Sequence, residues 1–151
     1  LLATLLFAGL VFVFALLSVL TITTGITGYA VGFGDEIAYD HLLQLWLAAG
    51  LLFAGFMALA FAVAVESDRA GPAIGIPAVF VLLNYLAWAI GGIWPDVGFL
   101  EDWSMFSLLE AQKVLAEGVA AGDLAVMLAF IVLLAGVAFY RFPRRDLPAP
   151  A

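Results

Sequence analysis

The chain has 151 residues, of which 66% are hydrophobic and 11% charged, and its mean hydropathy is +1.19. Soluble domains are about half apolar and a quarter charged, so this composition excludes a soluble globular domain and indicates lipid as the main solvent. The chain has no cysteine, which excludes disulfides and thiolate metal sites, and its net charge of -7 argues against a nucleic-acid partner.

Four apolar stretches without internal Asp, Glu, Lys or Arg lie at residues 1–24, 44–65, 73–94 and 123–140. As helices they would extend roughly 27 to 36 Å, enough to cross a ~30 Å hydrocarbon core. The sequence therefore predicts an all-α polytopic membrane protein with four transmembrane helices. Residues 1–147 would form a single transmembrane helical domain, and residues 148–151 a disordered tail.

The connections between the spans carry charge of alternating sign. Residues 66–72 and the chain end hold four basic against three acidic residues, whereas the two other connections hold one lysine against nine acidic residues. The basic residues are Arg69, Arg141, Arg144 and Arg145. By the positive-inside rule they form a cytoplasmic anchor, so both termini are expected to be cytoplasmic in a cell membrane. The acidic, lysine-poor connections are also typical of a halophilic source.

A stripe of small residues follows one side of the second span. Gly50, Ala54, Ala58 and Ala62 recur at a spacing of four. Small residues at this spacing allow another helix backbone to approach closely in lipid. We expect this stripe to be a helix packing face.

Polar residues inside the spans are few. Asn84 and Tyr85 form the most polar pair near the middle of a span, and are the candidates for a pathway contact or an interhelical polar contact. An amide at membrane depth needs a partner, and we favour a structural contact over a substrate contact. His41 has no second histidine with which to bind a metal, so it is interpreted as an interfacial residue.

The connection at residues 95–122 is longer than a link between two spans needs to be. Its apolar residues recur at helical spacing and predict a short amphipathic helix at the outer interface or slightly re-entering the membrane. They are Trp103, Phe106, Leu109, Val114 and Val119. Gly122 is expected to break this helix, and Asp123 to cap the last span.

Several kinds of chemistry lack the residues they require. No span carries an ionisable group, which disfavours a proton-driven carrier. The chain has neither a protease motif nor a phosphate-binding G-x-x-x-x-G-K-[ST] loop. We expect no enzymatic activity, no bound cofactor and no metal in this chain, and any energy source must lie in another subunit.

The order of several motifs resembles that of a known family. The stretch FMALAFAVAVESDRAGPAIGIPA joins an alanine-rich helix to a short charged loop, and a long outer connection contains Ser104, Met105 and Phe106. The last helix ends FYRFPRRDL, with F-x-R-R-D-L at residues 142–147. In these features the whole chain resembles the C-terminal half, the last four transmembrane helices, of a type-two ABC exporter permease subunit. It departs from that family where SLLEAQKVL replaces a Tyr-Tyr and Asp-Pro pattern.

The resemblance implies a permease component that forms part of a translocation pathway. A second permease half would face it, and a cytoplasmic ATPase subunit would hydrolyse ATP beneath it. Residues 66–72 and the chain end would be the parts able to touch an ATPase, and this piece alone would not transport. The alternative from composition and topology is a four-helix membrane scaffold or assembly subunit without its own pathway.

Overall fold

The computed structural model of the protein describes residues 2–32 and 39–144. Its four long helices are each long and apolar enough to cross a membrane. They are α1 (Leu2–Ala30), α2 (Tyr39–Glu66), α3 (Ala70–Ile93) and α6 (Ala121–Arg141). The prediction of an all-α fold with four candidate spans is confirmed. Arg145 and the tail predicted for residues 148–151 lie outside the described residues.

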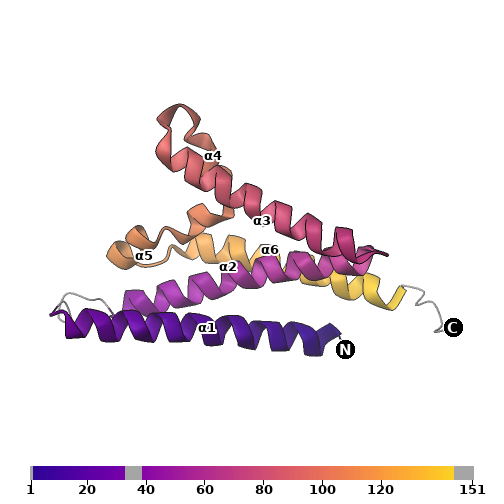
Figure 1. The fold of residues 1–151 in the computed structure, drawn as a ribbon, viewed down its shortest axis with the longest axis horizontal. Helices are drawn as coiled ribbons and strands as arrows, with labels where there is room; N and C mark the ends of the chain where they lie inside the picture. The colour runs from indigo at the N-terminus through magenta and orange to yellow at the C-terminus, as the bar shows by residue number, and fades with distance from the viewer. Residues whose placement is uncertain (1, 33–38, 145–151) are drawn as a thin grey trace.

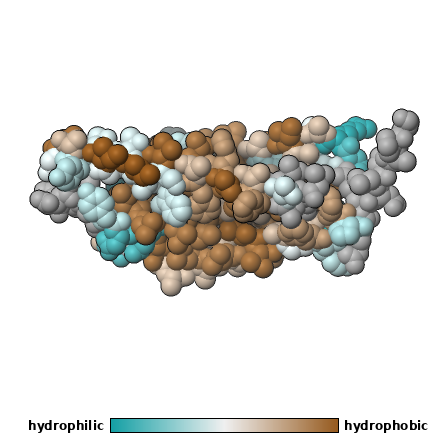
Figure 2. Space-filling view, turned by 90° about the horizontal axis from the view of Figure 1, so that it is seen from below, coloured by the Kyte–Doolittle hydropathy of each residue, from teal (hydrophilic) through white to brown (hydrophobic). Residues whose placement is uncertain are grey.

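The helix α2 is the centre of the molecule, because α1, α3 and α6 each pack against it (Figure 1). In its apolar window 56% of the residues are buried, against 11% or fewer in each of the other three helices. Seen from below, the middle of the molecule is covered by hydrophobic residues, and hydrophilic ones gather toward the two ends (Figure 2). Apolar side chains on the outside and polar ones at the ends match a lipid solvent.

Hydroxyl side chains inside α1 bond within the helix. Ser18 Oγ donates to the Phe14 carbonyl at 2.7 Å, and Thr23 and Thr24 donate to carbonyls four residues earlier. Each hydroxyl is thereby satisfied without water. These polar residues therefore do not interrupt α1, which can remain helical in an apolar environment.

The start of α1, the end of α6 and the connection from α2 to α3 all lie at one end of the molecule (Figure 1). We call it the basic end, made of residues 66–71 and 141–144. The opposite, acidic end contains the start of α2 at residues 39–44 and the connection at residues 94–120.

The connection from α3 to α6 folds into four short helices: η1 (Pro95–Val97), α4 (Phe99–Trp103), η2 (Met105–Leu109) and α5 (Ala111–Glu117). As α3 approaches the acidic end it runs away from α2 (Figure 1). The short helix η2 contacts both α2 and α3, and α5 contacts α2. The connection therefore turns back into the space between the diverging spans.

Helical structure in this connection was predicted, but the single helical face assigned to its apolar residues is wrong. Ser104 and Glu110 have extended backbone, with ψ of 139° and 94°, and separate α4, η2 and α5. As a result Trp103 is 86% exposed while Val114 is only 4% exposed. The five residues are distributed over three helices and the turn after them.

The prediction that Gly122 breaks the helix and Asp123 caps the last span is also wrong. The break is at Gly118, whose φ of +82° lies in the region that favours glycine, and α6 begins at Ala121 after Ala120 at its N-cap. Asp123 lies in the first turn of α6, where a carboxylate still interacts favourably with the helix dipole. The last element of the described part is η3 (Phe142–Arg144).

Candidate functional site

The segment at residues 104–109, which we call the re-entrant segment, enters the space between α2 and α3. Its start is bonded to Asn84, nine residues before the end of α3 at Ile93. At 1.5 Å rise per residue this corresponds to ~14 Å along the helix axis. The segment therefore reaches toward the middle of α3 and does not lie at the level of its end.

Asn84 connects α3 to the re-entrant segment. Its side-chain Oδ1 accepts a hydrogen bond from the backbone N–H of Met105 at 2.9 Å, and its backbone carbonyl accepts one from Ser104 Oγ at 2.8 Å. The amide nitrogen of Asn84 donates to the Phe80 carbonyl at 3.4 Å. Asn84 thus forms hydrogen bonds within the protein, to a segment that begins 20 residues later in the sequence.

Ser104 is the buried polar residue at the turn into η2, with 3% of its surface exposed. Its Oγ accepts from the Phe106 N–H at 3.1 Å, which caps the first turn of η2, and its carbonyl accepts from Ser107 Oγ at 2.7 Å. All these polar groups are satisfied within the segment or by Asn84. This local network allows a non-spanning piece of backbone to be buried among apolar side chains.

The apolar side chains of η2 complete a core around α2 and α6. Leu52, Phe56 and Met127 form its buried cluster. Met105, Phe106, Leu108 and Leu109 pack against this cluster. The rings of Phe56 and Phe106 lie 5.4 Å apart. Burial of these side chains is the main driving force that holds the re-entrant segment in place.

Tyr85 lies in a different environment from its neighbour Asn84. Its ring packs edge to face on Phe106 at 5.9 Å and lies 6.0 Å from Trp88. It lines an apolar groove of about 670 Å³ between α2 and α3, together with Phe56, Pro77 and Phe106. Of the two candidate residues, Asn84 bonds inside the chain and Tyr85 faces this groove.

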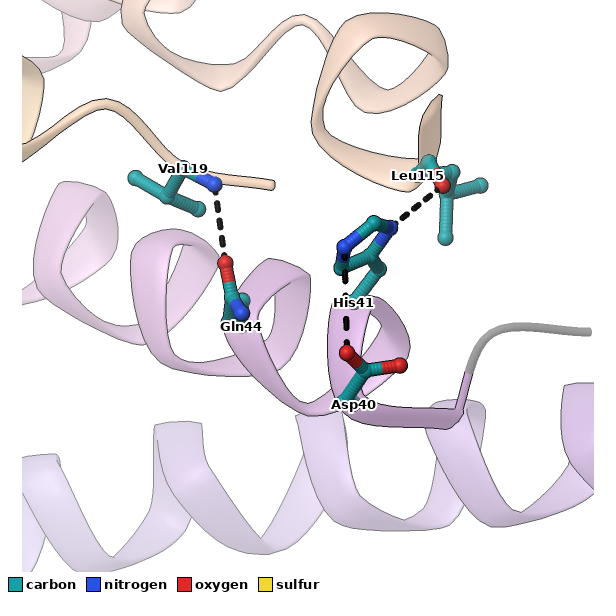
Figure 3. Close-up of polar contacts among 5 residues, drawn as sticks. All are labelled: Asp40, His41, Gln44, Leu115 and Val119. Carbon is teal, nitrogen blue, oxygen red and sulfur yellow. Dashed lines mark hydrogen bonds and ion pairs between the residues drawn. The ribbon is translucent and has the colours of Figure 1, made fainter. Parts of the chain in front are cut away.

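Polar contacts fasten α5 to the start of α2 (Figure 3). His41 Nδ1 donates to the Leu115 carbonyl at 2.8 Å, and Gln44 Oε1 accepts from the Val119 N–H at 2.9 Å. The His41 Nε2 lies 3.8 Å from the Asp40 carboxylate. His41 therefore orients the connection, and its ring nitrogens face a carbonyl and a neighbouring carboxylate.

The small-residue stripe of α2 is buried along its length. At Gly50 the ring of Phe14 from α1 occupies the space that a Cβ would need. Near the basic end Ala62 packs with Ala138 of α6 in a second core cluster. The stripe thus contacts two neighbouring helices in turn, α1 and then α6.

At the basic end, the side chains of α2 and α6 pair. Arg141 Nε lies 3.2 Å from Glu66 Oε1, with both side chains about half exposed. Arg69 is exposed at the N-cap of α3, and Arg144 is the last described residue. This end of the molecule thus carries three arginines against the two carboxylates of Glu66 and Asp68.

The sequence interpretation missed the role of Ser104 and the backbone of Met105 as partners of Asn84. A serine directly before the apolar run MFSLL is a helix-capping signal, and it could have placed the start of η2. Nothing in the local pattern could have linked it to Asn84. That pairing depends on how the whole connection folds back.

Comparison with known proteins found no match: no protein-family model, no curated protein and no solved structure is similar to this chain. Among residues 2–32 and 39–144, no three His, Cys, Asp or Glu side chains gather closely enough to hold a metal ion. The functional interpretation therefore depends on the geometry of the helices and the connection.

Proposed function

We propose that the chain is a membrane-spanning permease component of an ATP-driven ABC exporter, with ATP hydrolysis supplied by a separate subunit. In this proposal the basic end is cytoplasmic and the acidic end lies outside. The main support is the re-entrant segment. It contains Ser104, Met105 and Phe106, residues on which the resemblance to such permeases partly rests, and they lie between two spans rather than on the surface.

The groove between α2 and α3 supports a pathway function over a purely structural one. It is apolar, about 670 Å³ in volume, and open on one side rather than enclosed, so a second permease half can complete its wall. The helices α1, α3 and α6 also leave most of their surface uncovered, since 11% or fewer of the residues in each of their apolar windows are buried. A closed four-helix bundle would bury one face of every helix in a common core.

The test is recovery of partners from membranes solubilised in mild detergent, with the full chain carrying an affinity tag. We expect a P-loop ATPase to co-purify, identified by mass spectrometry. Arg69→Glu, which reverses an exposed charge at the basic end, should lower its recovery several-fold because complementary charge guides docking. Glu117→Lys, a reversal at an exposed position of the acidic end, is the matched control and should leave recovery unchanged.

Recovery of the protein as a stable bundle without an ATPase would contradict the exporter proposal. That result would favour the scaffold alternative. Equal loss of the ATPase in both charge-reversal variants would contradict docking at the basic end.

A further inference from the structure

Three large aromatic side chains are exposed at the acidic end, where α3 is followed by α4. Trp94 is 61% exposed, Phe99 58% and Trp103 86%. Phe99 and Trp103 are four residues apart in α4, so their side chains lie on the same side of this helix. Rings this exposed bury little of their apolar surface against the described residues. We call the side of α4 that carries Phe99 and Trp103 the aromatic face.

The contact between α4 and α3 sets the level of the aromatic face along the span. A Cβ on Gly91 would lie 2.5 Å from the backbone nitrogen of Glu101, so the middle of α4 lies directly against the last turn of α3. Figure 1 shows α4 beside that end of α3 and apart from α2. The aromatic face therefore lies close to the level at which the span ends, at Ile93.

The composition of this stretch excludes both bulk water and the hydrocarbon core as its surroundings. Asp96 and Asp102 are exposed and Glu101 is partly exposed, and an ionised carboxylate in hydrocarbon is costly. The rings, if they were in bulk water, would leave a large apolar surface hydrated. The headgroup region suits both, because its polar side solvates carboxylates and its apolar boundary accommodates aromatic rings.

The aromatic face also continues the uncovered surface of α3. Only 6% of the residues in the apolar window of α3 are buried. Leu82, Leu86 and Ile93 are exposed on this helix, and Trp94 follows directly after it. In a membrane-spanning helix such a surface contacts lipid. Since α4 packs against the end of α3, the same bilayer reaches the rings of α4.

We propose that the aromatic face of α4, together with Trp94, binds the headgroup region of the bilayer and anchors the end of α3 there. The occupant of this surface is lipid rather than another protein. The anchor fixes the depth of α3 at the point where the chain turns back toward Asn84. It does not depend on the exporter proposal or on which end is cytoplasmic, because it follows from the exposed rings, the carboxylates and the end of the span.

The test places a nitroxide label on single cysteines of the full chain, which has no cysteine of its own, in phosphatidylcholine vesicles. Phe99→Cys and Trp103→Cys report on the aromatic face. Glu117→Cys, at an exposed charged position of α5, is the water reference. Leu133→Cys, at an exposed apolar position near the middle of α6, is the lipid reference. Electron paramagnetic resonance measures collisions of each label with oxygen, which prefers lipid, and with a water-soluble nickel chelate.

We expect labels on the aromatic face to be intermediate between the two references. Their collision rate with oxygen should exceed that of the Glu117→Cys label about twofold or more, and their collision rate with the nickel chelate should exceed that of the Leu133→Cys label to a similar extent. Collision rates equal to those of either reference would overturn the proposal. Low rates with both reagents would also overturn it, because they would show that protein covers this face.

A second measurement keeps both rings in place. The fluorescence of the wild type is compared with that of Trp103→Phe in vesicles, and the difference reports on Trp103. We expect this difference signal to be quenched more strongly by lipids brominated near the headgroup end of the acyl chain than by lipids brominated near its tip. Quenching by aqueous iodide without quenching by either lipid would contradict the anchor.

Discussion

Asn84 is the residue on which the position of the connection most depends. It is a polar side chain within an apolar helix, and its Oδ1 and carbonyl accept bonds from Met105 and Ser104. A buried N–H without an acceptor costs about 1 to 3 kcal/mol, and little water can replace the lost bond at this depth. One amide therefore couples the middle of α3 to a segment that would otherwise lie at the membrane surface.

We expect Asn84→Ala to lower the free energy of unfolding by about 1 to 3 kcal/mol, because it leaves the Met105 N–H without an acceptor. Thermal unfolding of the detergent-solubilised protein measures this change. Tyr85→Phe is the neighbouring control: it keeps the ring contact with Phe106 and should shift stability by less than about 0.5 kcal/mol. Similar stability of the Ala variant and the wild type would contradict the role given to Asn84.

Gly50 provides a second test at the scale of one residue. A Cβ there would collide with the ring of Phe14, and that ring is held edge to face by Trp46 at 4.9 Å. Gly50→Ala should therefore destabilise the protein by about 1 to 3 kcal/mol, as overpacking does. Gly136→Ala in α6 meets no neighbour within 4 Å and should be neutral or stabilising by up to about 1 kcal/mol. Urea unfolding compares the pair, and equal effects would refute close packing of α1 on the stripe.

At the scale of elements, the contact of α4 with α3 decides how the connection turns back. Gly91 meets the backbone of Glu101, whereas the nearest atoms to a Cβ on Gly92 are the Glu101 carboxylate oxygens at 3.8 Å. Two adjacent glycines thus differ in what their substitution would do. The absence of a side chain at Gly91 allows α3 and α4 to touch, whereas a Cβ at Gly92 would make only ordinary van der Waals contacts.

We expect Gly91→Ala to displace α4 and loosen the re-entrant segment, because backbone atoms cannot move aside as a side chain can. Amide hydrogen exchange at residues 99–109 should increase markedly in this variant. In Gly92→Ala it should stay close to that of the wild type. An unchanged exchange pattern in Gly91→Ala would show that α4 does not dock on α3.

The spans could be predicted from the sequence because each carries its own signal. A continuous apolar run of sufficient length specifies a membrane helix whatever its neighbours are. The sequence also predicted that Asn84 needs a hydrogen-bond partner, since burying an unpaired amide in an apolar span is energetically unfavourable. Both inferences use only local residues and the solvent around them.

The path of the connection could not be predicted in the same way. Its bonds join residues far apart in sequence: His41 to Leu115 and Gln44 to Val119 are separated by 74 and 75 residues. Helical periodicity across residues 103–119 suited one continuous helix. The Ser104 cap, the bonds of Ser104 and Met105 to Asn84, and the packing of the η2 side chains on Leu52, Phe56 and Met127 instead favour three short pieces.

At the scale of the whole molecule, three spans pack around α2 and the two ends differ in net charge, since the basic end holds three arginines against Glu66 and Asp68. The described arginines Arg69 and Arg141 lie at the basic end, and α4 and α5 with their carboxylates lie at the other. By the positive-inside rule, this unequal distribution of basic residues predicts which end is cytoplasmic. The exporter proposal requires it, since an ATPase can reach only the cytoplasmic end.

Labelling of single cysteines with a membrane-impermeant maleimide tests this account most directly, because the chain has no cysteine of its own. Gly71→Cys at the basic end has no neighbour that its Cβ would meet, and Asp102→Cys lies at an exposed position of α4. We expect Asp102→Cys to react in intact cells, and Gly71→Cys to react only after the membrane is permeabilised. Reaction of Gly71→Cys from outside, or of both positions from the same side, would contradict the topology and the exporter proposal with it.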